Sequence, residues 1–182
     1  MMRATECLDD RSSIEQKIES AQHLHATWGD KLRRDPSIRD LLVKLEGNIE
    51  KSRQAMLSLG IFEACRRCDE EEGGSCCGAG LENKFDSFLL LMNLLVGVSL
   101  PQCHSRPDSC YLLAARGCML KVRLVLCVDF LCPKILDVLT RDELLRLQLI
   151  SGDELVTGFI LYDEIKRFFR QSGNTKPASR LL

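Results

Sequence analysis

Apolar side chains recur at steps of three and four residues along the first sixty positions, the spacing that gathers them on one face of a helix. Ser13-Ile14-Glu15-Gln16 has the form of a capping box and predicts the start of the first helix. Asp35-Pro36 predicts its end and the start of a second helix, because proline is tolerated in a first turn but not inside a helix. Gly60 is suited to the end of that second helix. The pattern therefore predicts a helical hairpin over residues 13–62, with two apolar seams packed together as an antiparallel pair.

The chain closes with a second helical pattern. Thr140-Arg141-Asp142-Glu143 is another capping box, and the apolar face continues in phase beyond it, which favours one long helix in residues 136–171 over two shorter ones. The predicted buried face of this helix consists of Leu144, Leu147, Leu155, Phe159, Tyr162, Ile165 and Phe169. The flanking segments, residues 1–12 and 172–182, are predicted to be a mobile leader and a frayed tail.

Cysteine and glycine are concentrated in the middle of the chain, in residues 63–135. An apolar stretch from about residue 82 to 98 predicts one buried helix. Two apolar triplets, Tyr111-Leu112-Leu113 and Cys118-Met119-Leu120, flank a short polar turn and predict at most a short β-hairpin. The expected fold class is mainly α, with the helical hairpin and the long C-terminal helix arranged around a cysteine-rich, loop-dominated centre.

Ten cysteines among 182 residues change this picture, because such a density indicates disulfides, metal ligands or redox chemistry. The sequence begins without the apolar stretch of a signal peptide, so we expect a cytoplasmic protein whose thiols stay reduced. Clustered thiolates in a reducing compartment are typical of metal ligands. The 25 basic and 26 acidic side chains leave a net charge of −1, which gives no electrostatic footprint for nucleic acid. No apolar run has the length of a membrane span, so we expect no membrane partner.

Eight of the cysteines fall into two groups, which we assign as candidate metal ligands. The groups are Cys65, Cys68, Cys76 and Cys77, followed by Cys110, Cys118, Cys127 and Cys132. The spacing Cys-x2-Cys lets two sulfur atoms reach one ion from a single chain turn. All-sulfur sites suit zinc and iron–sulfur clusters equally, so the expected cofactor is zinc or an iron–sulfur cluster, and the number of sites stays open. We expect the two groups to approach each other, because the first is followed by four acids and the second is embedded in apolar sequence.

A thioredoxin-like pair at Cys65 and Cys68 is disfavoured by its position. The pair follows the carboxyl end of the second predicted helix, whereas a reactive pair gains from a helix amino end. The acids in residues 69–72 raise the pKa of a neighbouring thiol and so oppose reactivity further. We interpret this acidic run as a solvated loop.

Several other residues could take part in chemistry, and each of them also has a purely structural interpretation. Cys7 is expected to be a free thiol in the leader, and Cys103-His104 to be exposed loop residues rather than ligands. His25 is expected to be a partly buried, hydrogen-bonded side chain. Glu82 is either an oxygen ligand or a first-turn carboxylate favoured by the helix dipole. Arg123 is either a counter-charge for a thiolate-rich site or an ordinary surface arginine.

The order of these cysteines resembles a family of bacterial and archaeal cysteine-cluster proteins described as chelating zinc or iron. In that family two close cysteines precede an adjacent pair, as Cys65, Cys68, Cys76 and Cys77 do here. The later family elements are similar to Cys110-Tyr111-Leu112-Leu113, Gly117-Cys118-Met119-Leu120 and Arg123-Leu124-Val125-Leu126-Cys127, with Cys132 as an additional cysteine. The resemblance covers about residues 65–132 and implies a zinc or iron centre there.

The sequence leaves three functions open. The first is a metal-binding protein without catalysis, in which the metal holds a loop-rich centre between helices. The second is an iron–sulfur enzyme, because some relatives of the resembled family are similar to methylases that act on protein lysine. The third is a thiol redox switch. The sequence assigns no catalytic residue, no protein partner and no physiological role.

Overall fold

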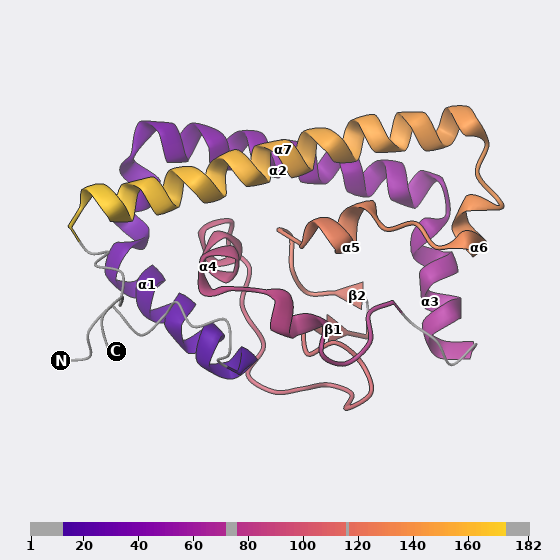
Figure 1. Cartoon of the computed structure of the whole chain (residues 1–182), viewed down its shortest axis with the longest axis horizontal. Helices are drawn as coiled ribbons and strands as arrows, with labels where there is room; N and C mark the ends of the chain where they lie inside the picture. Colours follow the sequence, from indigo (N-terminus) through magenta and orange to yellow (C-terminus); the bar gives the residue numbers. More distant parts are fainter. Residues whose placement is uncertain (1–12, 72–75, 116, 174–182) are drawn as a thin grey trace, which may run out of the picture.

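The computed structural model describes residues 13–71, 76–115 and 117–173 (Figure 1). Within these ranges the chain is mainly α-helical, as the sequence predicted, and contains one two-stranded hairpin. The helices are α1 (Ile14–Arg34), α2 (Pro36–Ser58), α3 (Ile61–Glu71), the short 3-10 helix η1 (Leu81–Lys84), α4 (Ser87–Leu95), α5 (Val125–Asp129), α6 (Pro133–Leu136) and α7 (Arg141–Gln171). The antiparallel strands are β1 (Leu113–Ala114) and β2 (Gly117–Cys118). The predicted leader and residues 174–182 of the predicted tail lie outside the described residues.

Local signals fix the boundaries of the first two helices. The predicted capping box is present at the start of α1, where the Ser13 amide donates to Gln16 Oε1 at 2.9 Å and the Gln16 amide donates to Ser13 Oγ at 3.4 Å. Asp35 accepts the Ile38 amide at 3.1 Å, and Pro36 lies in the first turn of α2. These side chains satisfy amides that have no partner inside the helix, which is why the boundaries were predictable.

A third helix follows where the sequence predicted a loop. Gly60 adopts a φ of 69°, which allows the chain to turn sharply at the end of α2. Ile61 is buried and begins α3, so Cys65 and Cys68 lie on a helix and not in a loop after α2. The expectation of a loop-dominated centre was therefore wrong for this segment.

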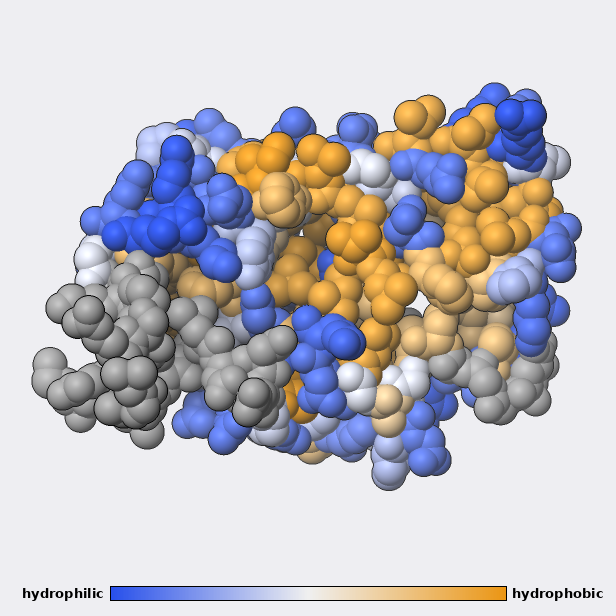
Figure 2. Space-filling model, in the orientation of Figure 1, coloured by the Kyte–Doolittle hydropathy of each residue, from blue (hydrophilic) through white to orange (hydrophobic). Residues whose placement is uncertain are grey.

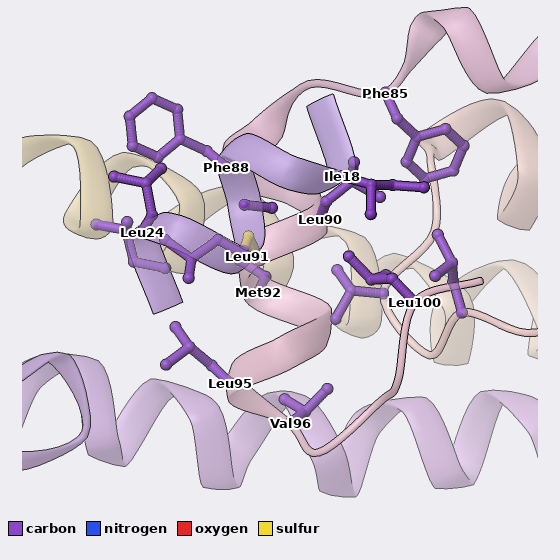
Figure 3. Packing of buried hydrophobic residues seen from close by; sticks show 14 of the residues in the cluster. Ile18, Leu24, Phe85, Phe88, Leu90, Leu91, Met92, Leu95, Val96 and Leu100 are labelled. Carbon is purple, nitrogen blue, oxygen red and sulfur yellow. The ribbon is translucent and has the colours of Figure 1, made fainter. Parts of the chain in front are cut away.

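The long helices pair differently from the expected hairpin (Figure 1). α2 packs mainly along α7, and α1 packs mainly on α4, whereas α1 and α2 contact each other less extensively. α4 is the predicted buried helix, although it spans only Ser87–Leu95. Figure 3 shows its side chains Leu90, Leu91 and Met92 in the middle of the core, beside Ile18 and Leu24 of α1. α1 and α2 therefore each pack their apolar face mainly against a helix that is distant in sequence.

α7 is one continuous helix, as predicted, and Thr140 and Glu143 form its capping box. It begins at Arg141 rather than at residue 136, because the separate helix α6 precedes it.

The predicted buried face of α7 was wrong in its middle part. Phe159 was assigned to that face, but its side chain is 74% exposed. The buried positions are Leu147, Ser151, Glu154, Thr157, Leu161, Ile165 and Phe169. Polar side chains are accepted there because α2 offers partners: Asn48 Nδ2 donates to Thr157 Oγ1 at 3.0 Å and to the Asp153 carbonyl at 3.1 Å. Phe169 does belong to the core and packs on Trp28 and Phe88.

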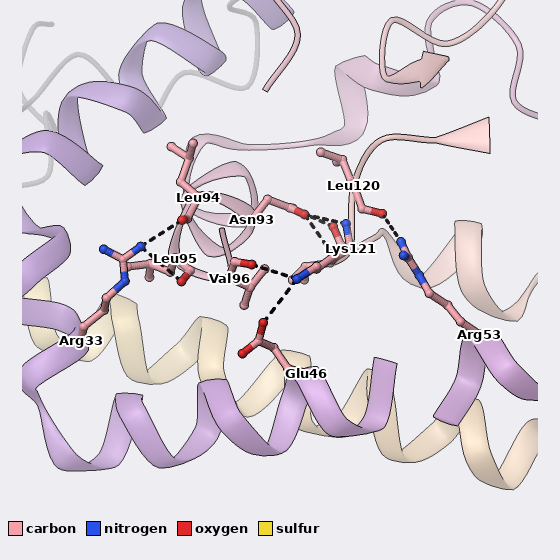
Figure 4. A network of polar contacts seen from close by, with 10 residues as sticks. Arg33, Glu46, Arg53, Asn93, Leu94, Leu95, Val96, Leu120 and Lys121 are labelled. Carbon is pink, nitrogen blue, oxygen red and sulfur yellow. Dashed lines mark hydrogen bonds and ion pairs between the residues drawn. The ribbon is translucent and has the colours of Figure 1, made fainter. Parts of the chain in front are cut away.

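Side chains of α2 and α4 hold the irregular segment that follows the hairpin (Figure 4). Asn93 is fully buried; its Oδ1 accepts the amides of Lys121 and Val122 at 2.9 and 3.0 Å, and its Nδ2 donates to the Val122 carbonyl at 2.8 Å. Arg53 Nη2 donates to the Leu120 carbonyl at 2.8 Å. These bonds replace the ladder that a longer strand would have supplied.

Apolar side chains are not confined to the interior. Figure 2 shows them gathered over α7 and the neighbouring part of the surface. The large exposed apolar residues of α5 and α7 are Val125, Leu126, Leu145, Leu149, Val156, Phe159 and Ile160. Among the described residues, no helix has both the length and the apolar composition needed to cross a bilayer.

We predict that Asn93→Ala lowers the free energy of unfolding by about 3 kcal/mol or more, because it leaves the buried amide and carbonyl of Val122 and the partly buried amide of Lys121 without partners. Urea unfolding followed by circular dichroism measures this loss. The exposed Gln54→Ala is the control and should change stability by less than about 0.5 kcal/mol. A loss below about 1 kcal/mol for Asn93→Ala would contradict the assigned role.

Candidate metal centre

The eight candidate cysteines come from six separate pieces of structure. Cys65 and Cys68 lie one turn apart on α3, and Cys76 and Cys77 follow residues 72–75, which lie outside the described ranges. The remaining four are Cys110 before β1, Cys118 in β2, Cys127 in α5 and Cys132 at the amino end of α6. None of the cysteines in the described residues forms a disulfide.

The backbone joins one cysteine of the first sequence group to the second. The Cys110 amide donates to the Cys77 carbonyl at 2.7 Å, and Gly78 pairs with Ser109 in an antiparallel bridge. Cys118 lies opposite Leu113 in the hairpin. Two segments that are about thirty residues apart in sequence therefore run side by side at this point.

Four thiols lie close enough together to repel one another as they ionise, and we call them the inner set: Cys77, Cys110, Cys118 and Cys127. Burial raises the pKa of Cys110 to about 11, with Glu82, Cys118 and Cys127 adding to the rise. Burial likewise raises the pKa of Cys127 to about 11, with repulsion from Cys118 adding. Cys110, Cys118 and Cys77 also take part in the large apolar core, so this set lies against it.

The other four thiols form an outer set: Cys65, Cys68, Cys76 and Cys132. Burial raises the pKa of Cys65 to about 11, and repulsion from Cys76, Cys132 and Cys68 contributes. Cys132 packs on a second apolar cluster that includes Ile61 of α3, which brings α6 to this side of the molecule. Both sets therefore mix cysteines of the two groups seen in the sequence.

Cys76 and Cys77 form the junction between the sets. A hydrogen bond between their side chains raises the pKa of Cys76 and lowers the pKa of Cys77. Cys77 is thus the one of the two that is more readily ionised.

Arg123 is a cation whose charge acts on thiols of both sets. Its charge lowers the pKa of Cys65, Cys118 and Cys127, against the larger effect of burial. Its side chain is only 9% exposed, so of its two sequence interpretations the ordinary surface arginine was wrong. Arg123 faces Glu154 of α7, a residue that was not predicted from the sequence. The sequence did contain a signal for it: Ser151, Glu154 and Thr157 lie at helical spacing between the buried Leu147 and Leu161.

Two acids of the run, Asp69 and Glu70, are paired with arginines. Arg66 pairs with Glu63 and Glu70, and Arg106 pairs with Asp69. Asp69 and Glu70 therefore lie on a helix, not in the expected solvated loop, and Arg66 is engaged away from the thiols.

The other candidates have structural partners. Glu82 accepts the Gly80 amide at 3.0 Å and the Tyr111 amide at 3.3 Å, so it fastens the turn before α4. His104 Nε2 lies 2.7 Å from the Ser109 carbonyl, and Cys103 is exposed. His25 is partly buried, as expected, with its Nε2 3.1 Å from Arg33 Nη2. Cys7 lies outside the described residues.

The donor chemistry of the two sets fits zinc or iron–sulfur ligation, since thiolate sulfur is the ligand type that both prefer. Across residues 13–71, 76–115 and 117–173, however, no three His, Cys, Asp or Glu side chains are already drawn together as a metal-binding group. Ligation would require the sulfur atoms to close around the ion.

No family model matches the chain, and neither the curated proteins nor the solved structures contain a match.

We predict that Cys77 in the metal-free, reduced protein is alkylated at lower pH than Cys127, because the thiolate is the reacting form and the pKa of Cys77 is lowered. Cys76→Ala removes the hydrogen-bond donor and should shift the labelling of Cys77 to higher pH, whereas Cys76→Ser keeps a donor and should shift it less. Mass spectrometry of iodoacetamide-labelled peptides across a pH series measures both. The same Cys77 profile in the wild type and in Cys76→Ala would disprove the role of the hydrogen bond.

Proposed function

We propose that this protein binds metal through its cysteines, in two centres of four thiolates each, as zinc ions or as iron–sulfur clusters. The proposal is supported by the thiols of α3, the hairpin, α5 and α6, which are near enough to affect one another's pKa although they are not drawn together as a metal-binding group in the described residues. Convergence of this kind between segments distant in sequence is typical of metal sites in cysteine-rich proteins.

The chemistry of the thiols supports the same conclusion. Burial and mutual repulsion keep most of these thiols protonated in the absence of a cation. A divalent ion reverses that preference by binding four thiols, releasing four protons and forming a tetrathiolate centre of net charge −2. The attraction between the ion and the thiolates must outweigh both their mutual repulsion and the cost of releasing the protons.

The centres would tie the small elements to the long ones. α5 and α6 are single turns, and the hairpin has two residues in each strand, so these elements bury little surface by themselves. A structural metal contributes about 10 kcal/mol or more of binding free energy, which is enough to order such segments. We propose on this basis a metal-holding role in a reducing, cytoplasmic setting, similar to that of the zinc- or iron-chelating family that the cysteine pattern resembles.

Metal analysis of anaerobically purified protein tests the proposal. We predict two zinc ions per chain, or iron and sulfide with broad visible absorption. Cys118→Ser in the inner set and Cys68→Ser in the outer set should each lower the metal content by about half, because each removes one of four ligands from one centre.

Cys103→Ser is the matched control, since Cys103 is exposed and belongs to neither set. It should keep the full metal content. The proposal fails if the wild type contains no metal, or if both ligand variants keep as much as Cys103→Ser.

A further inference from the structure

A cavity of about 240 Å³ lies between α2, α4, α7 and the segment that leads into α5. Its lining is mostly apolar and includes Leu45, Leu89, Val122 and Leu155. An engineered apolar cavity of about 150 Å³ is large enough to hold benzene. Pockets between helices with such a lining are typical of small-molecule sites. The space therefore suits a molecule about the size of a substituted benzene ring.

Two buried polar groups border this cavity without a partner. The side chains of Arg123 and Glu154 are 9% and 4% exposed. Among the described residues, neither Arg123 Nε nor Glu154 Oε2 has a hydrogen-bond partner. The closest approach of the two side chains, from Nη2 to Oε1, is 3.9 Å, which is too long for a hydrogen bond. Since buried polar atoms nearly always have a partner, an unpaired donor and an unpaired acceptor at one cavity indicate a ligand that serves both.

The charges around the cavity decide which kind of ligand it suits. Its charged lining residues in the described part of the chain are two cations, Lys84 and Arg123, and two carboxylates, Asp86 and Glu154. Asp86 already accepts the Tyr162 hydroxyl. An anion would be attracted by Arg123 but repelled by Glu154, and a cation would experience the reverse. An uncharged polar group is therefore favoured over either.

The cavity reaches the surface of the molecule. Val125 and Phe159 both border it, although 62% and 74% of these residues are exposed. Apolar side chains are gathered over α7 on this face (Figure 2). A bound ring would therefore contact apolar side chains at the opening as well as in the interior.

We propose that this cavity binds a small uncharged molecule that combines an apolar ring or short chain with a carboxamide-like group. The carbonyl oxygen of such a group accepts from Arg123 Nε, and its N–H donates to Glu154 Oε2, so that both unpaired atoms gain a partner. Among the described residues no cysteine borders the cavity. The inference thus goes beyond the proposed metal binding and does not depend on it.

NMR titration of the full chain with four probes of similar size tests this inference. The probes are benzamide, which is neutral, benzoate, which is an anion, benzamidine, which is a cation, and toluene, which has no polar group. We expect benzamide to bind about tenfold or more tightly than each of the others. Glu154→Gln leaves the charge of Arg123 unopposed, so it should raise the affinity for benzoate about tenfold and leave benzamidine weak.

Two glycines of α7 supply a matched pair of variants. Gly158 borders the cavity, and a Cβ there would lie 3.8 Å from Leu45 Cδ1, which is an ordinary contact. Gly152 does not border the cavity, and a Cβ there would meet nothing within 4 Å. Both variants replace a glycine inside a helix with a better helix former, so both should fold. Gly158→Met should fill the cavity and abolish benzamide binding, whereas Gly152→Met should bind benzamide as the wild type does.

A wild type that binds no benzamide would overturn the inference and would show a cavity that holds only water. Equal affinities for toluene and benzamide would overturn it too, because the polar pair would then play no part. The same holds for unchanged benzoate binding in Glu154→Gln and for unchanged benzamide binding in Gly158→Met.

Discussion

The buried Asn93 carboxamide is the interaction on which the arrangement of the centre depends. The segment between β2 and α5 has no strand partner, yet its backbone groups lie in the core, where unsatisfied amides and carbonyls are costly. Asn93 of α4 forms hydrogen bonds with three of these backbone groups, and Arg53 of α2 bonds a fourth. Because this segment joins Cys118 to Arg123 and then to α5, fixing its path fixes where those groups can lie.

That path has an electrostatic consequence. It leads Arg123 under α7, opposite Glu154, and places its charge beside thiols of α3, β2 and α5. The α2–α7 pair supplies the surroundings, since Asn48 and Thr157 bond across it one turn away from Glu154. The polar layer of the long helices and the thiols of the small elements are thus linked through one guanidinium.

The parts of the fold that could be predicted are those that local chemistry decides. Ser13, Asp35 and Thr140 cap their helices with side chains only three residues away from the amides they bind. The buried face of α7 could not be predicted in the same way. Glu154 and Thr157 are tolerated inside because Arg123 and Asn48, which are distant in sequence, face them. With those polar positions buried, Phe159 on the same helix is left exposed.

For a related reason, the sequence could not show which cysteines belong to each of the two sets. Spacing groups Cys76 with Cys77, because adjacent residues are the nearest possible ligands. In the structure the charges of Cys110, Cys118 and Cys127 act on Cys77, whereas the charge of Cys76 acts on Cys65 and also on Cys127. The hydrogen bond between the Cys76 and Cys77 side chains lies where the two sets meet, so adjacency in sequence does not decide which set each thiol belongs to.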